Sequence, residues 1–457
     1  MIETAKLDAV FDEIISRWGV PGLGVGIVQD GEIVYTRYAG VQSLDTQVPV
    51  TGSSIFGIAS IAKIFVASAV MQLVEQGKIG LDMPVAQYLP YFRLDDPRYP
   101  EITIRQMLSH TSGMPDMEES EYDELVYHPE YDEGAPERYV RSLSRYKMIA
   151  APGERFYYSN IAYNVLGDLI AKVSGQTFED YLSEHILSPA GMPDSTFFYP
   201  AVPQERLAVP HLRIPEMIVN PIYPYHRADA PASFLHTTVG EMCHWAITCL
   251  NGGFYQGQRI LSPASFDLMW TPVVDRGSPP LYESHGLGWV LGHYEGLKTA
   301  GHGGGGFGWT DFFLLLPEVK GGFVILINEE SSARSRFIRA VLNAMLDRQP
   351  EAGAVSWMIP IGQALQAGGI QAAYARYAEI KDDPAYFFDA YELVCLVYQL
   401  MSVKNFDLAI EVLKLNLHVF SQDAETYHLL GKLYFQKGET QLAEEMFQQE
   451  KRWTPKP

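Results

Sequence analysis

The 457-residue chain contains only three cysteines, Cys243, Cys249 and Cys395, and these cannot all pair with one another. This excludes a disulfide framework and is typical of a reducing compartment. No stretch is long and apolar enough to span a bilayer, and the first residues form an amphipathic helical pattern in place of a signal peptide. We expect a cytoplasmic protein with no membrane partner.

Basic residues are fewer than acidic ones. The chain has 34 lysines and arginines and 55 aspartates and glutamates, which give a net charge of -21 at pH 7. Such a charge repels nucleic acids and anionic lipids, so neither is expected as a partner. Residues 116–137 are acidic and contain no lysine or arginine before Arg138. A run of this kind usually marks a solvated face. If it overhangs a substrate site, it would favour a cationic substrate such as a peptide with a free amine.

Spacings typical of metal or nucleotide sites are absent too. None of the 12 histidines has a partner at a convincing zinc spacing, and His285, His293 and His302 are expected on separate loops. The glycine-rich residues 22–26 superficially suggest a dinucleotide loop. They lie, however, in an alternating strand that turns at residues 30–31, with no helix following. We expect no metal and no cofactor.

What the chain does contain is a serine and a lysine three residues apart on an apolar helix. Lys63 is the only charged residue between positions 58 and 70, which predicts a buried helix. Residues at i and i+3 share a helix face, so the amine can reach the Ser60 hydroxyl. Burial disfavours the ammonium form and makes a proton-accepting amine accessible. The pair therefore has the geometry of an activated nucleophile, although a Ser-x-x-Lys spacing also occurs on solvated helix faces.

Two further segments supply groups that such a nucleophile needs. Tyr158-x-Asn160 precedes an amphipathic helix expected at residues 161–173. A phenol near a lysine can give up and return a proton, and an asparagine amide can donate to a substrate carbonyl while it orients the lysine. The structural alternative is a packed tyrosine ring and an asparagine that caps the helix. In the glycine-rich residues 301–308, a strand-edge N–H can serve an oxyanion hole, and a flexible hairpin is the alternative.

The chain thus carries three short motifs in order: Ser60-x-x-Lys63, Tyr158-x-Asn160 and His302-Gly303-Gly304. Their order and separations resemble the signature motifs of the serine β-lactamase and penicillin-binding-protein superfamily. The Tyr-x-Asn and His-x-Gly forms resemble the branch of class C β-lactamase-like proteins, D-aminopeptidases, D-alanyl-D-alanine carboxypeptidases and related esterases. Supporting matches lie at residues 108–115, 190–192 and 286–289.

The resemblance implies a role for each residue of the first two motifs. Ser60 would be the acylated nucleophile, Lys63 its activating partner and Tyr158 a proton shuttle. Either Lys63 or Tyr158 could act as the base for acylation. Asn160 would position both the lysine and the substrate.

For the third motif, the resemblance implies a place on the strand that borders the site. His302 would occupy a position where relatives carry lysine or histidine, followed by the substrate-binding Gly303 and Gly304. The backbone N–H groups of the nucleophile and of Gly305 would form the oxyanion hole. One departure concerns residues 231–234, which read Pro-Ala-Ser-Phe where relatives commonly have Pro-Ala-Gly-Gly. That loop borders the site in the family, so the departure bears on substrate scope.

The pattern changes near residue 349, and the chain is too long for one compact core. We expect a hydrolase domain at residues 1–348, a linker at 349–356 and an all-α domain at 357–457. In the last segment, three apolar positions recur at the tetratricopeptide period of 34: Leu396, Ala409 and Leu413 are followed by Leu430, Ala443 and Phe447. Such hairpins stack and commonly bind peptides or partner subunits, so we expect a homodimer or a protein partner here.

These observations predict an α+β protein with a β-lactamase-like fold, in which an antiparallel sheet is flanked by helices and an all-α subdomain, followed by helical repeats. The expected reaction is acyl transfer to water through acyl-Ser60, with a small ester or a D-amino-acid amide or peptide as substrate. β-Lactamase or D-alanyl-D-alanine carboxypeptidase activity is one alternative. A catalytically silent binding protein that uses its helical repeats is another.

Overall fold

The computed structural model describes residues 2–278 and 280–454, which divide into two compact units. One unit runs from Pro21 to Pro210 and from Asn220 to Glu330, and it contains all the predicted site residues. The other combines the residues up to Val20, the segment His211–Val219 and the residues from Ser331 onward. The domain boundaries at residues 348 and 357 stay predictions. The compact units group the first helix of the chain with its C-terminal helices.

The first unit is built on an eight-stranded sheet in the order β2-β1-β14-β13-β12-β11-β10-β9, in which every neighbouring pair is antiparallel. Its strands are β1 (Gly22–Gln29), β2 (Glu32–Gly40), β9 (Val274–Ser278), β10 (Tyr282–His285), β11 (Val290–Tyr294), β12 (Leu297–Gly306), β13 (Trp309–Leu316) and β14 (Gly321–Ile327). The predicted antiparallel sheet is confirmed.

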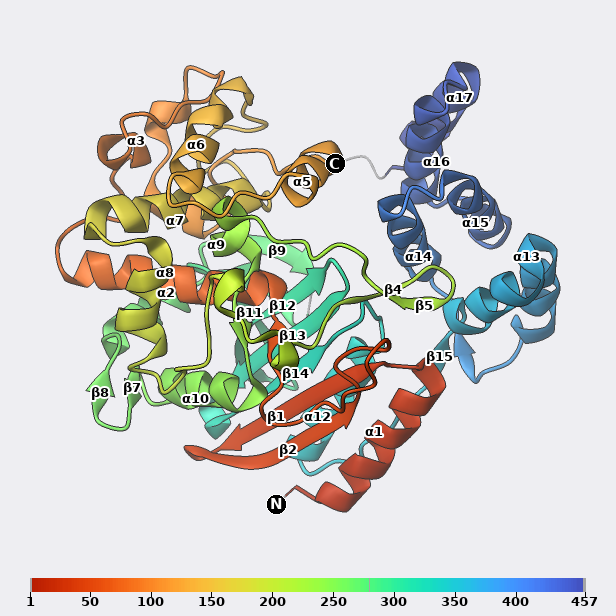
Figure 1. Ribbon diagram of the computed structural model, residues 1–457, viewed down its shortest axis with the longest axis horizontal. Coiled ribbons are helices and arrows are strands. Elements are labelled where there is room, and N and C mark those ends of the chain that lie inside the picture. Colours follow the sequence, from red (N-terminus) through yellow and green to blue (C-terminus); the bar gives the residue numbers. More distant parts are fainter. Residues whose placement is uncertain (1, 279, 455–457) are drawn as a thin grey trace. The chain divides into compact units, whose positions relative to one another are not determined.

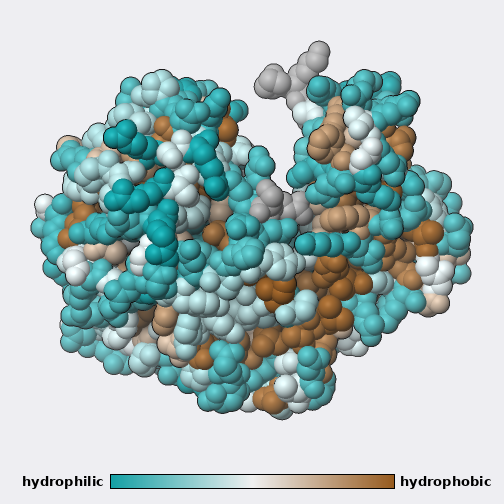
Figure 2. Space-filling view, turned by 45° about the horizontal axis from the view of Figure 1, so that its top comes forward, coloured by the Kyte–Doolittle hydropathy of each residue, from teal (hydrophilic) through white to brown (hydrophobic). Residues whose placement is uncertain are grey.

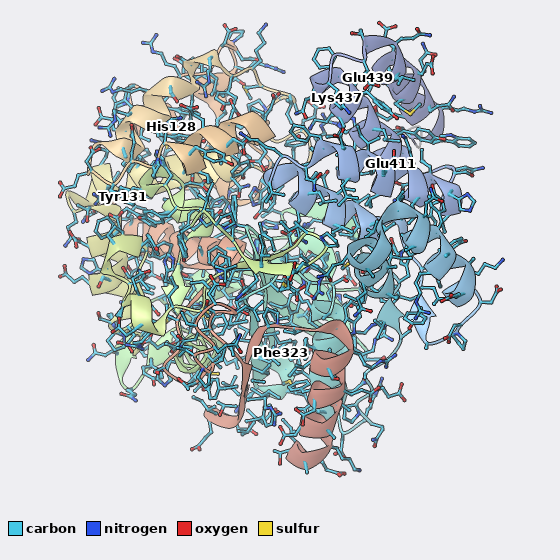
Figure 3. The ribbon with its side chains drawn as sticks, turned by 45° about the vertical axis from the view of Figure 1, so that its right-hand side comes forward. His128, Tyr131, Phe323, Glu411, Lys437 and Glu439 are labelled. Atoms are coloured by element: carbon cyan, nitrogen blue, oxygen red, sulfur yellow. The ribbon has the colours of Figure 1, made fainter. Side chains whose placement is uncertain are left out.

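Hydrophobic patterning explains which strands lie at the centre of this sheet. Strands β13 and β14 are buried over their whole length, as continuous apolar runs require, whereas the edge strand β9 is mostly exposed. Phe323 of β14, labelled in Figure 3, lies with its ring centroid 6.1 Å from that of Phe312 in β13. The glycine-rich segment near the N-terminus is strand β1, which turns at Asp30 and Gly31 as predicted.

Helices cover the sheet and also form a separate all-α subdomain (Figure 1). Helix α10 packs against β1 and β14, while α7 packs against α2, α4, α6, α8 and α9. The helices are α2 (Ala62–Glu75), α3 (Val85–Tyr88), α4 (Ile104–Leu108), α5 (Glu119–Tyr127), α6 (Ala135–Ser142), α7 (Asn160–Ser174), α8 (Phe178–Leu182), α9 (Ala230–Ser233), α10 (Val239–Leu250) and α11 (Pro263–Met269). Two short strand pairs complete the unit: β3 (Phe56–Gly57) with β6 (His236–Thr237), and β7 (Phe254–Tyr255) with β8 (Gln258–Arg259).

The second unit is mainly helical. It contains α1 (Thr4–Trp18), α12 (Arg334–Met345), α13 (Met358–Ile380), α14 (Ala390–Ser402), α15 (Phe406–Val419), α16 (Ala424–Gln436) and α17 (Thr440–Trp453), with the hairpin β4 (His211–Arg213) and β5 (Met217–Val219) and the parallel pair β15 (Val355–Ser356) and β16 (Tyr386–Phe387). Helix α13 is broken at Gly368 and Gly369, whose backbone is not helical. The ring of Trp18 in α1 lies 6.0 Å from that of Phe387 in β16.

The last four helices follow the predicted 34-residue spacing. Helix α16 begins 34 residues after α14 (Ala390 to Ala424), and α17 begins 34 residues after α15 (Phe406 to Thr440). Helices α14 and α15 pack together as a pair, and so do α16 and α17. Charged side chains form salt bridges on these helices: Lys437 pairs with Asp407 and lies near Glu439 (Figure 3). The all-helical character of this region is confirmed.

Hydrophilic side chains cover much of the face displayed in Figure 2. Among the described residues, none of the helices combines the length and the apolar character needed to cross a membrane.

Trp357 provides a test of the packing in the helical unit. It is fully buried, its ring contacts Phe388 and Phe420, and its Nε1 donates to the Asp389 carbonyl. Trp357→Ala should therefore lower the free energy of unfolding of this unit by about 3–5 kcal/mol in urea titrations followed by circular dichroism. The control Phe435→Ala removes an aromatic ring that is 66% exposed, and it should change that free energy by less than about 0.5 kcal/mol. Equal losses in the two variants would contradict the described packing.

Candidate active site

Ser60 lies in a short 3-10 turn, Ala59–Ile61, that runs directly into helix α2. Ala59 has a positive φ of 43°, so the chain turns sharply just before the serine. Strand β12 passes close by, since a Cβ on Gly304 would lie 2.4 Å from the carbonyl oxygen of Ile58. Only glycine permits this approach, which places the His302-Gly303-Gly304 run beside the serine.

Lys63 is fully buried on the first turn of α2, and its Nζ has three polar neighbours. The amine lies 2.7 Å from Asn160 Oδ1, 2.7 Å from the carbonyl oxygen of Ala232 and 3.0 Å from Ser60 Oγ. The first two oxygens can only accept hydrogen bonds, whereas the serine hydroxyl can donate one. The arrangement therefore fits a neutral amine that donates to Asn160 and Ala232 and points its lone pair at the serine proton.

The Ala232 carbonyl owes its position to close packing between α9 and α7. A Cβ on Gly167 of α7 would lie 2.1 Å from the ring of Pro231, so the proline fits only against a glycine. Pro231 precedes Ala232 in α9, and both are buried. The loop that departs from the family pattern thus still supplies an acceptor to Lys63.

Burial and the neighbouring carboxylates shift the pKa of Lys63 in opposite directions. Burial lowers the pKa of Lys63 to about 7, and the carboxylates of Asp116 and Asp229 oppose this shift. Burial also raises the pKa of Asp229 to about 7, against a hydrogen bond donated by Asn164 Nδ2 at 2.7 Å. The amine and this carboxyl interact, so they titrate as a pair. A proton-accepting amine at neutral pH follows from this environment.

Tyr158 is positioned by stacking. Its ring lies 4.2 Å from the ring of His110 with an interplanar angle of 26°, and Lys63 Nζ lies 4.9 Å from its centroid. Burial raises the pKa of Tyr158, although a hydrogen bond with Ser60 favours the ionised form. The phenol is therefore protonated at neutral pH and can act as a proton donor next to the serine.

Asn160 is the first residue of α7, and it does not cap that helix. The cap is Ser159, whose Oγ accepts from the backbone N–H of Ala162 at 3.2 Å. The structural alternative for Asn160 is thus wrong, because its side chain points into the site instead. Its Nδ2 donates to Asp116 Oδ2 at 3.0 Å and to the Tyr122 hydroxyl at 2.7 Å. These two hydrogen bonds fix the orientation of the Asn160 amide, so its oxygen faces Lys63.

His302 lies on β12, at the point where this strand loses one neighbour. Strand β11 pairs with β12 only as far as Gly301, so the following residues are paired on the β13 side alone. His302 Nδ1 lies 2.7 Å from the Gly303 carbonyl oxygen and must donate to it. Burial lowers the pKa of His302 to about 3, so the ring is neutral near pH 7. The register pairs Gly305 with Thr310 of β13.

The expectation that His285, His293 and His302 lie on separate loops is wrong. They lie on strands β10, β11 and β12, and the ring centroids of His285 and His302 are 6.3 Å apart. His285 also contacts His110, at 4.9 Å between centroids. Sequence spacing could not show this, because antiparallel pairing of distant strands brings the rings together. Within the part of the chain that the structure describes, no three His, Cys, Asp or Glu residues form a cluster that could hold a metal ion.

Sequence reasoning missed four residues at this site: Asp116, Tyr122, Asp229 and Arg276. The first two fall in the acidic run 116–137, for which the sequence leaves open a solvated face or a segment that overhangs the site. Arg276 of β9 stacks on Phe156, 4.9 Å from the ring centroid, and its charge acts on Tyr158. Asp229 lies two residues before Pro231, so the departure in that loop was the nearest indication of it.

Comparison with known proteins agrees with this geometry. A family model described as Beta-lactamase matches residues 7–346. The chain belongs to the Beta-lactamase family. Protein flp of Staphylococcus aureus (strain MW2) is 25% identical over 327 residues, which make up 71% of this chain and 63% of that protein. The chain therefore spans less than two thirds of the length of this curated relative.

Solved structures of this family share the fold. The octameric penicillin-binding protein homologue from Pyrococcus abyssi superposes with a TM-score of 0.68 at 28% identity, covering 76% of this chain and 78% of that one. The D-amino acid amidase from Ochrobactrum anthropi SV3 gives a TM-score of 0.65 at 22% identity, covering 75% and 99%, which shows the fold alone. The predicted β-lactamase-like fold is confirmed.

The paired titration of Lys63 and Asp229 generates a prediction about pH. A neutral amine accepts the serine proton, so labelling of Ser60 by a fluorophosphonate should accelerate as pH rises through about 7. The negative charge of Asp229 raises the pKa of Lys63, so Asp229→Asn should move this acidic limb to lower pH, by about one unit. The exposed control Asp267→Asn should leave the profile in place. A limb that moves to higher pH in Asp229→Asn would contradict the assigned direction.

Proposed function

We propose that this chain is a serine hydrolase that works through an acyl-Ser60 intermediate on small esters or on D-amino-acid amides and short peptides. The observation that carries the proposal is the contact of 3.0 Å between Ser60 Oγ and the buried amine of Lys63. Two carbonyl acceptors occupy the N–H groups of that amine, so its lone pair is available to the serine proton.

The steps of acylation follow from this arrangement. Lys63 takes the hydroxyl proton as Ser60 Oγ attacks the substrate carbonyl carbon, and the developing oxyanion is bound by the N–H groups of Ser60 and Gly305. Tyr158 gives its proton to the leaving oxygen or nitrogen and regains one from Lys63. Water then attacks the acyl-enzyme carbonyl, loses a proton to the same groups and releases the acid with Ser60 restored.

The neutral state of His302 supports an ester or amide as substrate. A lysine in that position would present a cation to a substrate carboxylate, but burial keeps the His302 ring uncharged near pH 7. The solved amidase with this fold is named for D-amino acid amides, which is the same class of acyl compound. Free carboxylates next to the scissile bond are therefore not required for binding.

A second candidate function, D-alanyl-D-alanine carboxypeptidase or β-lactamase activity, is favoured by Arg276. Among the described residues this guanidinium forms no salt bridge with a carboxylate, and it lies over the rings of Phe156 and Tyr282. Its charge acts on Tyr158, on the side of the site that serves the leaving group in the proposed mechanism. An arginine in that place could bind a substrate carboxylate.

The nucleophile assignment predicts that Ser60→Ala loses both fluorophosphonate labelling and hydrolysis. Removing the attacking oxygen eliminates the covalent route, so turnover should fall by roughly three orders of magnitude or more. Ser68→Ala is the matched control, because Ser68 lies on helix α2, which follows the turn of Ser60, and donates to the Ile64 carbonyl. Peptide mass mapping and a kinetic assay provide the measurement. Full turnover by Ser60→Ala would contradict the proposal.

The choice between the two candidates predicts an order of substrates. Short-chain aryl esters and D-aminoacyl amides should have kcat/KM values at least about tenfold above those of a chromogenic cephalosporin and of D-alanyl-D-alanine peptides. The last two substrates carry a carboxylate that the neutral His302 ring cannot pair with, and the loss of one charge-assisted contact is worth about that factor. Steady-state kinetics with this panel provide the test. A peptide or cephalosporin at the top of the order would establish the second candidate instead.

A further inference from the structure

The side chain of Asn160 has no donor left for a substrate. A side-chain amide offers two N–H donors and one oxygen acceptor. The oxygen accepts from Lys63, and the two N–H groups donate to Asp116 and to the Tyr122 hydroxyl. Any substrate carbonyl that is to bind Asn160 must therefore displace one of these two partners.

The two partners are held in very different ways. The Asp116 carboxylate also accepts from the backbone N–H groups of Asn160 and Met117, so three donors fix it. Tyr122 contributes one hydroxyl from helix α5, and the charged side chains of Asp123 and Glu124 next to it are exposed. The hydroxyl of Tyr122 is thus the partner that can be displaced.

Tyr122 lies at the site as a neutral group. Burial raises the pKa of Tyr122 well above its ordinary value, and the carboxylates of Asp229 and Asp116 act in the same direction. Tyr158 is also among the groups that act on it, which places the Tyr122 hydroxyl in the electrostatic neighbourhood of the nucleophile. The phenol therefore contributes a dipole and a ring to the site, without a charge.

Two more aromatic rings hold Tyr122 in place. Its ring lies 5.7 Å from that of Phe307, and Phe307 in turn lies 5.9 Å from Phe234. Phe307 sits at the tip of the β12–β13 hairpin with a positive φ of 60°, a conformation that costs energy for a bulky residue. Phe234 belongs to the loop that departs from the family pattern. Three separate segments thus bring their rings together next to Asn160.

We propose that Tyr122 is a specificity-determining residue that reserves the Asn160 amide and thereby disfavours acyl groups with a second carbonyl. An N-acylamino substituent carries such a carbonyl and would need the donor that Tyr122 occupies. Simple alkanoyl groups and aminoacyl groups with a free amine make no such demand. This inference rests on the proposed function, since it concerns the acyl group that is transferred to Ser60.

Tyr122→Phe tests the inference because it removes the hydroxyl and keeps the ring. The assay compares two p-nitrophenyl esters, one of butyric acid and one of N-acetyl-D-alanine. The ratio of kcat/KM for the N-acetyl ester to that for the butyryl ester should rise about 3- to 10-fold, chiefly through a lower KM, because one hydrogen-bond donor is released. The control Tyr127→Phe, on the same helix and 42% exposed, should leave the ratio unchanged.

Phe307→Leu gives a second reading if Tyr122→Phe does not fold. This variant lacks the ring that holds Tyr122 in place, so the ratio of the two kcat/KM values should also rise in Phe307→Leu. A ratio that stays constant or falls in a folded variant would overturn the inference, because the hydroxyl would then assist binding or play no part. Labelling of Ser60 in the unaltered protein separates a failure of the proposed function from a failure of the inference about Tyr122. Absent labelling contradicts the proposed function, whereas labelling with a constant ratio contradicts only the role of Tyr122.

Discussion

The candidate site depends on one buried amine. Lys63 lies inside an apolar helix, where a charged ammonium is costly, and two carbonyl oxygens take up its N–H groups. What remains is a lone pair directed at Ser60. The surrounding arrangement maintains this state: Asn160 is oriented by Asp116, the Ala232 carbonyl is placed by Pro231, and the nearby carboxyl of Asp229 sets how readily the amine takes up a proton.

Close backbone approach is the second constraint that shapes the site. The unit that contains the eight-stranded sheet brings a helix start, a helix N-terminus and a sheet strand together at Ser60, Asn160 and the His302 run. The bare backbone of Gly304 lets β12 reach the turn before the serine, and Gly167 lets α9 reach α7. A Cβ would lie 2.4 Å from the Ile58 carbonyl oxygen at Gly304 and 2.1 Å from the Pro231 ring at Gly167, so either pair of elements would have to move apart. The chemistry therefore depends on glycines that take no part in it.

Local sequence patterns predicted much of this arrangement. The lone lysine in an apolar helix indicated burial, and the resemblance of the three ordered motifs to the serine β-lactamase superfamily implied which distant residues would meet. Lys63 indeed contacts both Ser60 and Asn160, and its amine lies over the ring of Tyr158. Asp229 and Arg276 could not be predicted in this way, because neither belongs to one of the three motifs and only their positions in the fold bring them to the site. The place of Tyr122 in the site was not predicted for a related reason, since the acidic residues around it in the sequence are typical of a solvent-exposed segment.

The account stands on the protonation state of Lys63, which can be measured directly. Heteronuclear NMR of protein labelled with 13C at lysine Cε reports the titration of each amine, and Lys63→Arg identifies the resonance of interest by its loss. The account predicts that this amine titrates near pH 7, well below the ordinary value of about 10.4. A resonance that stays in the ammonium form up to about pH 10 would contradict the central claim, because the amine could then not take the proton of Ser60.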